Sequence, residues 1–510
     1  MKVNQLKIGS LLSYLQMALN ILINLFYTPI MIHTLGKNEY GLYQTVTSTI
    51  AMLSILSLGF NASYVRFFAK YKQKDDQKAI DRLNGLFLIV FTIIGIIAFA
   101  CGIFLTLNLE LVFSTGLTAS EYEIAEVLML LSTINLALMF PMSVFQNIIS
   151  ANERFVVLKL LGMLKTVFSP LVGIPLLLMG FRSVVLVLIT LVISIITDCI
   201  YIYYVLYVLK NRFVFHDFEK GIFKNLFVYT SFIAINMIVD QINLNVGKIL
   251  LGRYRGTSDA AVYSVGFTLY HMYQSFSTSV SSVFTPRIHK IVNETKDNIQ
   301  KQRRQLTELF VKVGRVQFLI LGLISTGIVF FGHSFIVDFW AGDGYEDSYG
   351  VAILFILPAT IALIQNVGIE IQRALNKHQF RSIVYLFMAF VNLGISIMLC
   401  QRYGAIGCAV GTAISFVLAN GIVMNIYYHK QCSIDIIYFW KNILRMSVGL
   451  LIPIVAGIVI NRYVDTSKLS AFVLSVGVYT IVYVFSMWTM AMNAYEKDIV
   501  NRFFRKMRRK

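Results

Sequence analysis

Long apolar runs recur along the whole of this 510-residue chain. A run of about 20 apolar residues is long enough for a helix to cross the hydrocarbon core of a bilayer. Only 14% of the residues are charged, whereas an ordinary soluble domain has about 25%. The sequence therefore predicts an all-α polytopic membrane protein. We expect about fourteen transmembrane helices, over residues 8–32, 42–68, 83–107, 124–150, 156–179, 184–209, 226–251, 260–285, 308–332, 349–372, 380–400, 405–428, 443–461 and 469–492.

The formal net charge is +18, and the Lys and Arg residues are distributed along the chain as the predicted topology requires. With the N-terminus placed in the cytoplasm, 36 of the 44 Lys and Arg residues fall on the cytoplasmic side and seven fall outside, while Lys248 lies within a helix. This asymmetry is typical of membrane proteins whose positive loops stay in the cytoplasm. We therefore expect both termini to be cytoplasmic, and no nucleic-acid partner. The terminal run 505–510 either contacts anionic membrane lipids or serves as a stop-transfer flank.

Motifs for metal binding or for catalysis do not occur in the sequence. The five cysteines are scattered, and they form no Cys-x-x-Cys or Cys/His ligand spacing. The two longest outer loops, residues 108–123 and 333–348, contain no Lys or Arg. No nucleophile with a neighbouring base and no nucleotide-binding loop appears. We expect neither a metal nor a cofactor, and we do not expect an enzyme.

A polar stretch lies inside the apolar run 226–251. On a regular helix, Asn236, Asp240, Asn243 and Gly247 form one stripe, and a second polar stripe lies beside it. Polar groups at this depth face a protein interior or a water-filled cavity. Polar contacts between helices are the alternative explanation. The predicted cavity residues are Asn20, Asn24 and Tyr27 of the first helix, Asn236, Asp240, Asn243, Asn245 and Lys248 of the seventh, and His271 and Gln274 of the eighth.

A weak internal repeat relates the first six predicted helices to the next six. Gln146-Asn147 is echoed by Gln365-Asn366, and Gly180 is echoed by Gly404, at an offset of about 216 to 224 residues. Six helices per copy give both copies the same orientation in the membrane. We expect two pseudo-symmetric lobes, residues 1–212 and 213–432, around a central cavity that opens alternately to each side. Residues 433–510 then form two further helices and a basic cytoplasmic tail.

Several short motifs at this spacing resemble the oligosaccharide flippase family, the polysaccharide transporters of the multidrug/oligosaccharidyl-lipid/polysaccharide exporter superfamily. The resemblance covers most of residues 1–430. One departure is that the family often places an Asp directly before the basic residue of the seventh helix, where this chain has Gly247. The motifs are Asn24, Pro29, Leu35-Gly36, Tyr40-Gly41-Leu42-Tyr43, Leu58-Gly59-Phe60 and Arg66 in the first lobe, and residues 248–252, Ala261, Tyr263, Pro286 and residues 403–407 in the second.

The resemblance implies a flippase that translocates undecaprenyl-pyrophosphate-linked oligosaccharide repeat units across the bacterial cytoplasmic membrane, for O-antigen, capsule or related polysaccharide. Polysaccharide polymerases and glycosyltransferases are the partners that it implies. Three alternatives remain. A multidrug or cation antiporter of the same superfamily would have twelve helices. A peptidoglycan lipid-precursor flippase would have an arginine-rich cavity. A membrane polysaccharide polymerase or ligase would need a large outer loop.

A lipid-linked pyrophosphate needs cations along its route. Arg66 and Lys248 are the predicted cations, and a snorkelling anchor is the alternative role for each. Asp240 is the acid nearest the middle of a predicted helix, and Asp198 lies in the sixth helix. Each is a candidate for coupling transport to a proton or sodium ion.

Overall fold

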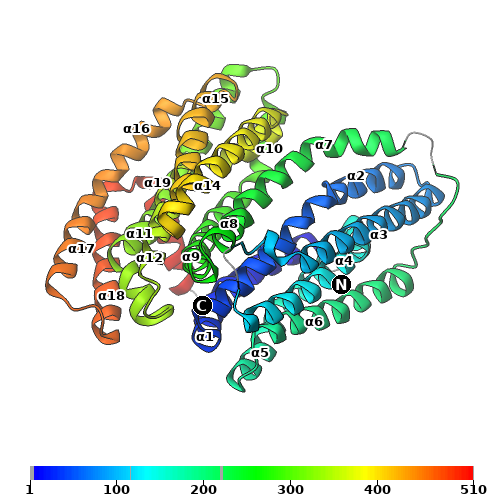
Figure 1. The fold of residues 1–510 in the computed structure, drawn as a ribbon. Coiled ribbons are helices and arrows are strands. Elements are labelled where there is room, and N and C mark those ends of the chain that lie inside the picture. The colour runs from blue at the N-terminus through cyan, green and yellow to red at the C-terminus, as the bar shows by residue number, and fades with distance from the viewer. Residues whose placement is uncertain (1–4, 115–116, 219–221, 509–510) are drawn as a thin grey trace. The chain divides into compact units, whose positions relative to one another are not determined.

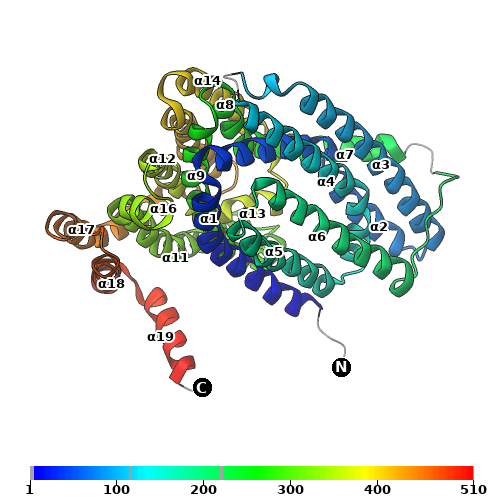
Figure 2. The same cartoon turned by 60° about the horizontal axis from the view of Figure 1, so that its bottom comes forward.

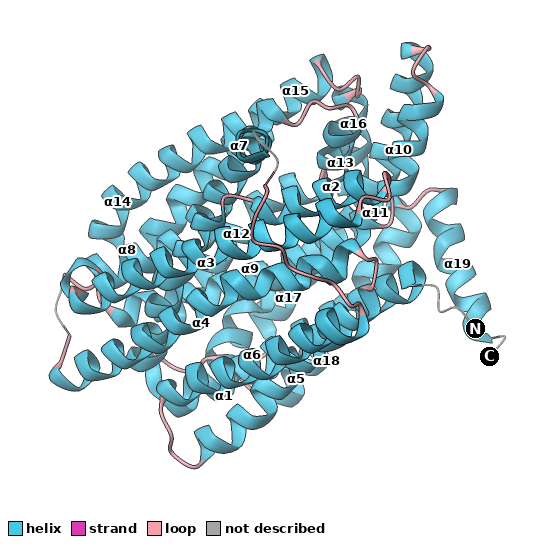
Figure 3. Ribbon diagram, turned by 90° about the vertical axis from the view of Figure 1, so that its right-hand side faces the viewer, coloured by secondary structure: helices cyan, strands magenta, loops and turns pink. Residues whose placement is uncertain are grey.

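The computed structural model describes residues 5–114, 117–218 and 222–508. Almost all of these residues lie in helices, and none of them is in a strand (Figure 3). The chain packs into two compact units, residues 1–264 with 393–408 and residues 265–392 with 409–510. The prediction of an all-α fold is confirmed. The predicted division at residues 212 and 432 follows the repeat rather than the packing, and it stays a prediction.

The first unit is built around long, closely packed helices. α4 packs against both α3 and α6, and α1 packs against α5 (Figures 1 and 2). Part of α14 (Gln379–Phe416), residues 393–408, also belongs to this unit. Its other elements are α1 (Gln5–Met52), η1 (Leu53–Ser57), α2 (Phe60–Lys72), α3 (Gln77–Leu107), η2 (Leu109–Leu111), α4 (Ala119–Ala151), α5 (Phe155–Leu178), α6 (Ser183–Tyr203), η3 (Tyr204–Val208), α7 (Ile222–Gln241), η4 (Ile242–Val246), α8 (Gly247–Tyr254) and the start of α9 (Thr257–Ser282).

The second unit contains the rest of α9 and α14. It ends with α19, a basic helix that follows α17 and α18 (Figure 2). Its other elements are α10 (Thr285–Glu294), α11 (Ile299–Ser334), η5 (Phe335–Trp340), α12 (Glu346–Leu363), α13 (Val367–Ala374), η6 (Val417–Val423), α15 (Met424–Lys430), α16 (Ile436–Ser447), η7 (Val448–Leu450), α17 (Leu451–Tyr463), α18 (Leu469–Ser486), η8 (Met487–Ala491) and α19 (Ala494–Arg508).

Each of the fourteen predicted ranges lies mostly on helical backbone. Among the described residues, ten helical segments are long and apolar enough to cross a membrane. Two of the ten, Leu11–Lys72 and Gln379–Lys430, each cover two predicted helices. The polytopic membrane class therefore holds, while the count of fourteen crossings stays a prediction. Side chains from Lys506 onward lie outside the described residues, so lipid contact by the terminal basic run stays a prediction as well.

Two predicted helices are interrupted, which the apolar sequence does not indicate. The range 42–68 breaks at η1 and at Leu58 and Gly59, which both have left-handed backbone conformations. A Cβ at Gly59 would overlap Ile233 of α7, so glycine is needed there both for its backbone angle and for close packing. The range 349–372 breaks between α12 and α13. There the hydroxyl of Ser277 donates to the carbonyl of Leu363 at 2.9 Å, which satisfies one backbone group at the break.

Backbone angles recur along the chain at the offset of the predicted repeat. Left-handed turns recur at Glu153 and Asn376, at Gly180 and Gly404, and at Lys210 and Ser433, always 223 or 224 residues apart. The repeated side chains make equivalent bonds. Asn147 donates to Asn61 at 2.7 Å, and Asn366 donates to Ser281 at 3.0 Å. In the same way Gln146 hydrogen-bonds Asp198 of α6, and Gln365 donates to Asn425 of α15 at 3.0 Å.

Candidate functional site

The first half of α1 is exposed on two opposite faces. Leu11, Leu15, Leu22 and Phe26 form an exposed apolar face, with Phe26 66% accessible. Asn20 and Asn24 are also exposed, and each lies two residues before an apolar one. Two residues correspond to about 200° around an α-helix, so the amides lie on the side away from Leu22 and Phe26. The apolar face can contact lipid. Exposed amides at membrane depth instead need contact with water.

Tyr27 lies at the edge of this polar face and is directed toward α5. Its hydroxyl lies 2.6 Å from the position of a Cβ on Gly173, so the small residue makes room for the phenol. The Nε2 atom of Gln16 lies 2.9 Å from the corresponding position on Gly162. Small residues of α5 thus let polar side chains of α1 pack against it. Tyr27 is half-buried in this contact.

The predicted polar stripe of the seventh helix is interrupted by a π turn. η4 covers Ile242–Val246, in the middle of the polar stretch, and a π turn shifts the side chains that follow it around the helix. Gly247 is buried, and a Cβ there would overlap the hydroxyl of Tyr263. The predicted extension of the stripe to Gly247 is therefore wrong, because it assumed a regular α-helix. Asp240 is exposed, and Asn236 and Asn243 are half-buried.

The second polar stripe consists of Gln241, Asn245 and Lys248, and these side chains make contacts inside the first unit. Asn245 is buried, and its amide donates to the Oε1 atom of Gln241 at 2.6 Å. Lys248 is half-buried and donates to the Oε1 atom of Gln44 in α1 at 3.3 Å. Lys248 therefore joins the seventh helix to the second half of α1, and it lies about two turns from Asp240 along the helix.

The break after η1 packs against α7 one to two turns before Asp240. Ile233 contacts Gly59, and Met237 accepts a hydrogen bond from Ser57 at 3.8 Å. A broken helix and a π-interrupted helix thus meet in one unit. Arg66 lies on α2, seven residues beyond the break, and it is exposed. Irregular backbone at membrane depth is tolerated where it is buried in protein or lines a water-filled cavity.

Asp198 belongs to a polar cluster of α4, α5 and α6. Gln146 hydrogen-bonds its carboxylate, and the charge of Lys165 attracts it. The Nζ atom of Lys165 donates to Ser194, one turn before Asp198, at 2.6 Å. The topology predicted from sequence places Lys165 at the cytoplasmic flank, but it lies ten residues into α5, about 15 Å along the helix. In the sequence, the i, i+4 spacing of Ser194 and Asp198 was the feature that could have indicated this cluster.

The two remaining predicted residues belong to the second unit. His271 is exposed and Gln274 is half-buried, and both lie on α9. Their carbonyls accept hydrogen bonds from Ser275 at 2.9 Å and from Thr278 at 3.4 Å. Their role in binding stays a prediction. Within the described ranges, no group of three His, Cys, Asp or Glu residues could hold a metal ion.

Together, these helices define a polytopic membrane protein with a transporter fold. The structure resembles that of the lipid II flippase MurJ in an inward closed conformation, with a TM-score of 0.71 and 15% sequence identity over 97% of this chain and 99% of MurJ. It also resembles an inward-facing multidrug resistance MATE transporter of the MOP superfamily, with a TM-score of 0.62 and 14% identity over 85% of this chain and 99% of that transporter. At these identities the likeness shows the fold.

Sequence comparison gives the family. The polysaccharide biosynthesis protein family matches residues 7–292, which is more than half of the chain. This protein therefore belongs to that family. It is also 24% identical over 212 residues to the capsular polysaccharide biosynthesis protein CapF of Staphylococcus aureus. That match spans 41% of this chain and half the length of CapF.

Proposed function

We propose that this protein translocates undecaprenyl-pyrophosphate-linked oligosaccharide repeat units across the bacterial cytoplasmic membrane, for the synthesis of a surface polysaccharide. The observation that carries the proposal is the exposed polar face of α1, opposite an exposed apolar face. A sugar headgroup needs donors and acceptors in place of water, and side-chain amides supply both. Membership of the polysaccharide biosynthesis family supports a glycan as the cargo.

In this proposal the two lobes open alternately to each side of the membrane. Asn20, Asn24 and the amides of the seventh helix contact the sugars. Arg66 and Lys248 bind the pyrophosphate, because charge-assisted bonds to phosphate are stronger than neutral ones. Both termini lie in the cytoplasm. Glycosyltransferases supply the substrate, and a polysaccharide polymerase uses the product.

A peptidoglycan lipid-precursor flippase is the second candidate. The structural likeness to MurJ extends over 97% of this chain, compared with 85% for the MATE transporter. The smaller share of this chain that the MATE transporter matches argues against a twelve-helix multidrug antiporter. Lipid II and a lipid-linked repeat unit share a pyrophosphate, so cargo competition between them separates the two candidates.

Replacing Asn20 and Asn24 together with leucine is expected to lower polysaccharide export at least tenfold. Each sugar hydroxyl left without a partner costs about 1–3 kcal/mol. The measurement is surface polysaccharide in a deletion strain that carries the variant, normalised to the amount of protein in the membrane. Leu22→Ala with Phe26→Ala on the opposite face is the control, and its export should stay normal. Equal export by the two double variants would contradict the assignment of the polar face.

Asp240 is the proposed site of coupling to a proton or sodium ion. It is exposed on α7 beside the π turn, and it is the acid nearest the middle of the seventh predicted helix. Asp240→Asn is expected to leave translocation in proteoliposomes indifferent to an imposed ion gradient, because the amide does not titrate. Asp198→Asn should keep the gradient dependence. If Asp240→Asn keeps it too, ion coupling through Asp240 is wrong.

A further inference from the structure

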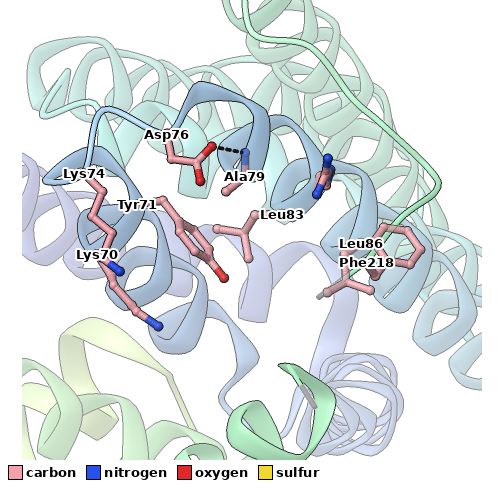
Figure 4. A pocket seen from close by; sticks show the side chains of 9 residues that line it. Lys70, Tyr71, Lys74, Asp76, Ala79, Leu83, Leu86 and Phe218 are labelled. Atoms are coloured by element: carbon pink, nitrogen blue, oxygen red, sulfur yellow. Dashed lines mark hydrogen bonds between the residues drawn. The ribbon is translucent and has the colours of Figure 1, made fainter. Parts of the chain in front are cut away.

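A pocket of about 350 Å³ lies where α2 turns into α3, at the end of the first unit that the charge distribution places in the cytoplasm. Ligand pockets in proteins are typically about 300–1,000 Å³. Figure 4 shows Lys70 and Lys74 on one side of the pocket, Leu86 and Phe218 on the other, and Tyr71 and Leu83 between them. The lining residues are Lys70, Tyr71, Lys74, Asp76, Ala79, Arg82, Leu83, Leu86 and Phe218.

The polar side of the pocket has an excess of positive charge. Lys70, Lys74 and Arg82 line it with a single acid, Asp76. The carboxylate of Asp76 accepts the backbone N–H of Ala79 at 3.0 Å and so caps α3. Among the described residues, no carboxylate lies within salt-bridge distance of the three cations. Three donors around one cavity match the oxygens of a phosphate group.

The opposite side of the pocket is apolar and rigid. Leu83 and Leu86 are buried in the core of the unit, and Phe218 packs against that core. Phe218 comes from the connector that follows α6, which is tied to α3 by two bonds. Val214 donates to the carbonyl of Asp81 at 3.0 Å, and Asn84 donates to the carbonyl of Arg212 at 3.0 Å. The connector therefore holds an apolar wall in place beside the basic rim.

We propose that this pocket binds the phosphate group of a lipid. A basic side next to an apolar side fits a phosphate ester with an attached hydrocarbon chain better than it fits a free anion. Anionic phospholipids and a lipid-linked pyrophosphate share this chemistry. The site is separate from the polar face of α1, and it does not depend on which lipid the protein translocates.

The test measures binding to the full-length protein in nanodiscs of neutral phosphatidylcholine, without translocation. The probes are dihexanoyl phosphatidylglycerol, which joins a phosphate to apolar chains, and inorganic pyrophosphate, which has no chain. Lys70→Gln with Lys74→Gln should weaken phosphatidylglycerol binding at least tenfold, because two charge-assisted bonds are lost. Inorganic pyrophosphate should bind the unaltered protein at least tenfold more weakly than phosphatidylglycerol.

The matched control is Lys72→Gln with Lys78→Gln. These lysines are also exposed and lie in the same segment, but they do not line the pocket. Their substitution removes the same amount of charge. Binding in the control should change less than twofold. Equal weakening by the two pairs would overturn the site, because it would mean general electrostatic attraction. Pyrophosphate binding as tight as that of phosphatidylglycerol would overturn the assignment to a lipid.

Discussion

Replacing Arg315 with methionine is expected to lower the free energy of unfolding by about 3–5 kcal/mol, because it strands a buried charge. Arg315 of α11 and Glu496 of α19 have side chains that are only 6% and 1% exposed. The Nε and Nη2 atoms of Arg315 donate to the two carboxylate oxygens at 2.6 and 2.9 Å. Nη2 also donates to the carbonyl of Ala491 at 2.9 Å. This bidentate contact fixes the start of the C-terminal helix α19 to α11 within the second unit.

The same helix offers a control for this effect. Arg304 pairs with Glu308 at 3.1 Å, but both side chains are at least half exposed. Exposed i, i+4 pairs contribute about 0.3–0.5 kcal/mol, so Arg304→Met should barely change stability. The measurement is the midpoint of thermal unfolding of the purified protein in detergent. Arg315→Met with Glu496→Met should recover part of the loss, because it removes the stranded charge. Similar midpoints for Arg315→Met and Arg304→Met would contradict the buried pair.

Gly41→Ala is expected to destabilise the first unit by about 3 kcal/mol or more, the upper end of overpacking effects. An added Cβ would overlap the backbone carbonyl of Thr257, and a backbone group cannot rotate away. Four residues later, Thr45 lies against Gly252 of α8. Small residues thus let the second half of α1 approach α8 and α9 closely. The separation that alanine forces would also loosen the contact of Lys248 with Gln44.

Gly394→Ala is the matched control for Gly41→Ala. Gly394 lies within α14, and nothing lies within 4 Å of a Cβ added there. Alanine favours a helix over glycine by about 1 kcal/mol, so this variant should be neutral or stabilised. The readouts are the yield of monodisperse protein and the midpoint of thermal unfolding. A Gly41→Ala protein as stable as Gly394→Ala would rule out the close approach of these helices.

Much of the fold could be predicted because the length and hydropathy of membrane helices make them recognisable in a sequence. The offset of the repeat could also be predicted. Gln146-Asn147 and Gln365-Asn366 bond to equivalent partners in the two units, and the same residue pair therefore appears twice in the sequence. The break after η1 could not be predicted from the sequence. The segment Leu53–Gly59 is as apolar as its surroundings, and it is the packing of Gly59 on Ile233 that favours the break.

The candidate site was predictable in composition but not in geometry. A regular α-helix would place Gly247 on the same stripe as Asp240. The π turn at Ile242–Val246 shifts Gly247 off that stripe, and such a change of backbone register depends on tertiary packing. The pairing of Arg315 with Glu496 joins residues 181 positions apart, and the sequence offers no spacing that reveals it. The basic pocket was missed for the same reason, since Phe218 comes from the connector that follows α6.

Translocation of a defined glycan by the purified protein decides the proposed activity. Full-length protein is reconstituted into proteoliposomes that contain an undecaprenyl-pyrophosphate-linked oligosaccharide, and a glycosidase added outside reports which glycans have crossed. We expect the unaltered protein to expose the lipid-linked oligosaccharide to the enzyme, and the Asn20→Leu, Asn24→Leu protein to do so at least tenfold more slowly. Liposomes in which this glycan stays protected, while lipid II or a cationic drug crosses, would contradict the proposed function.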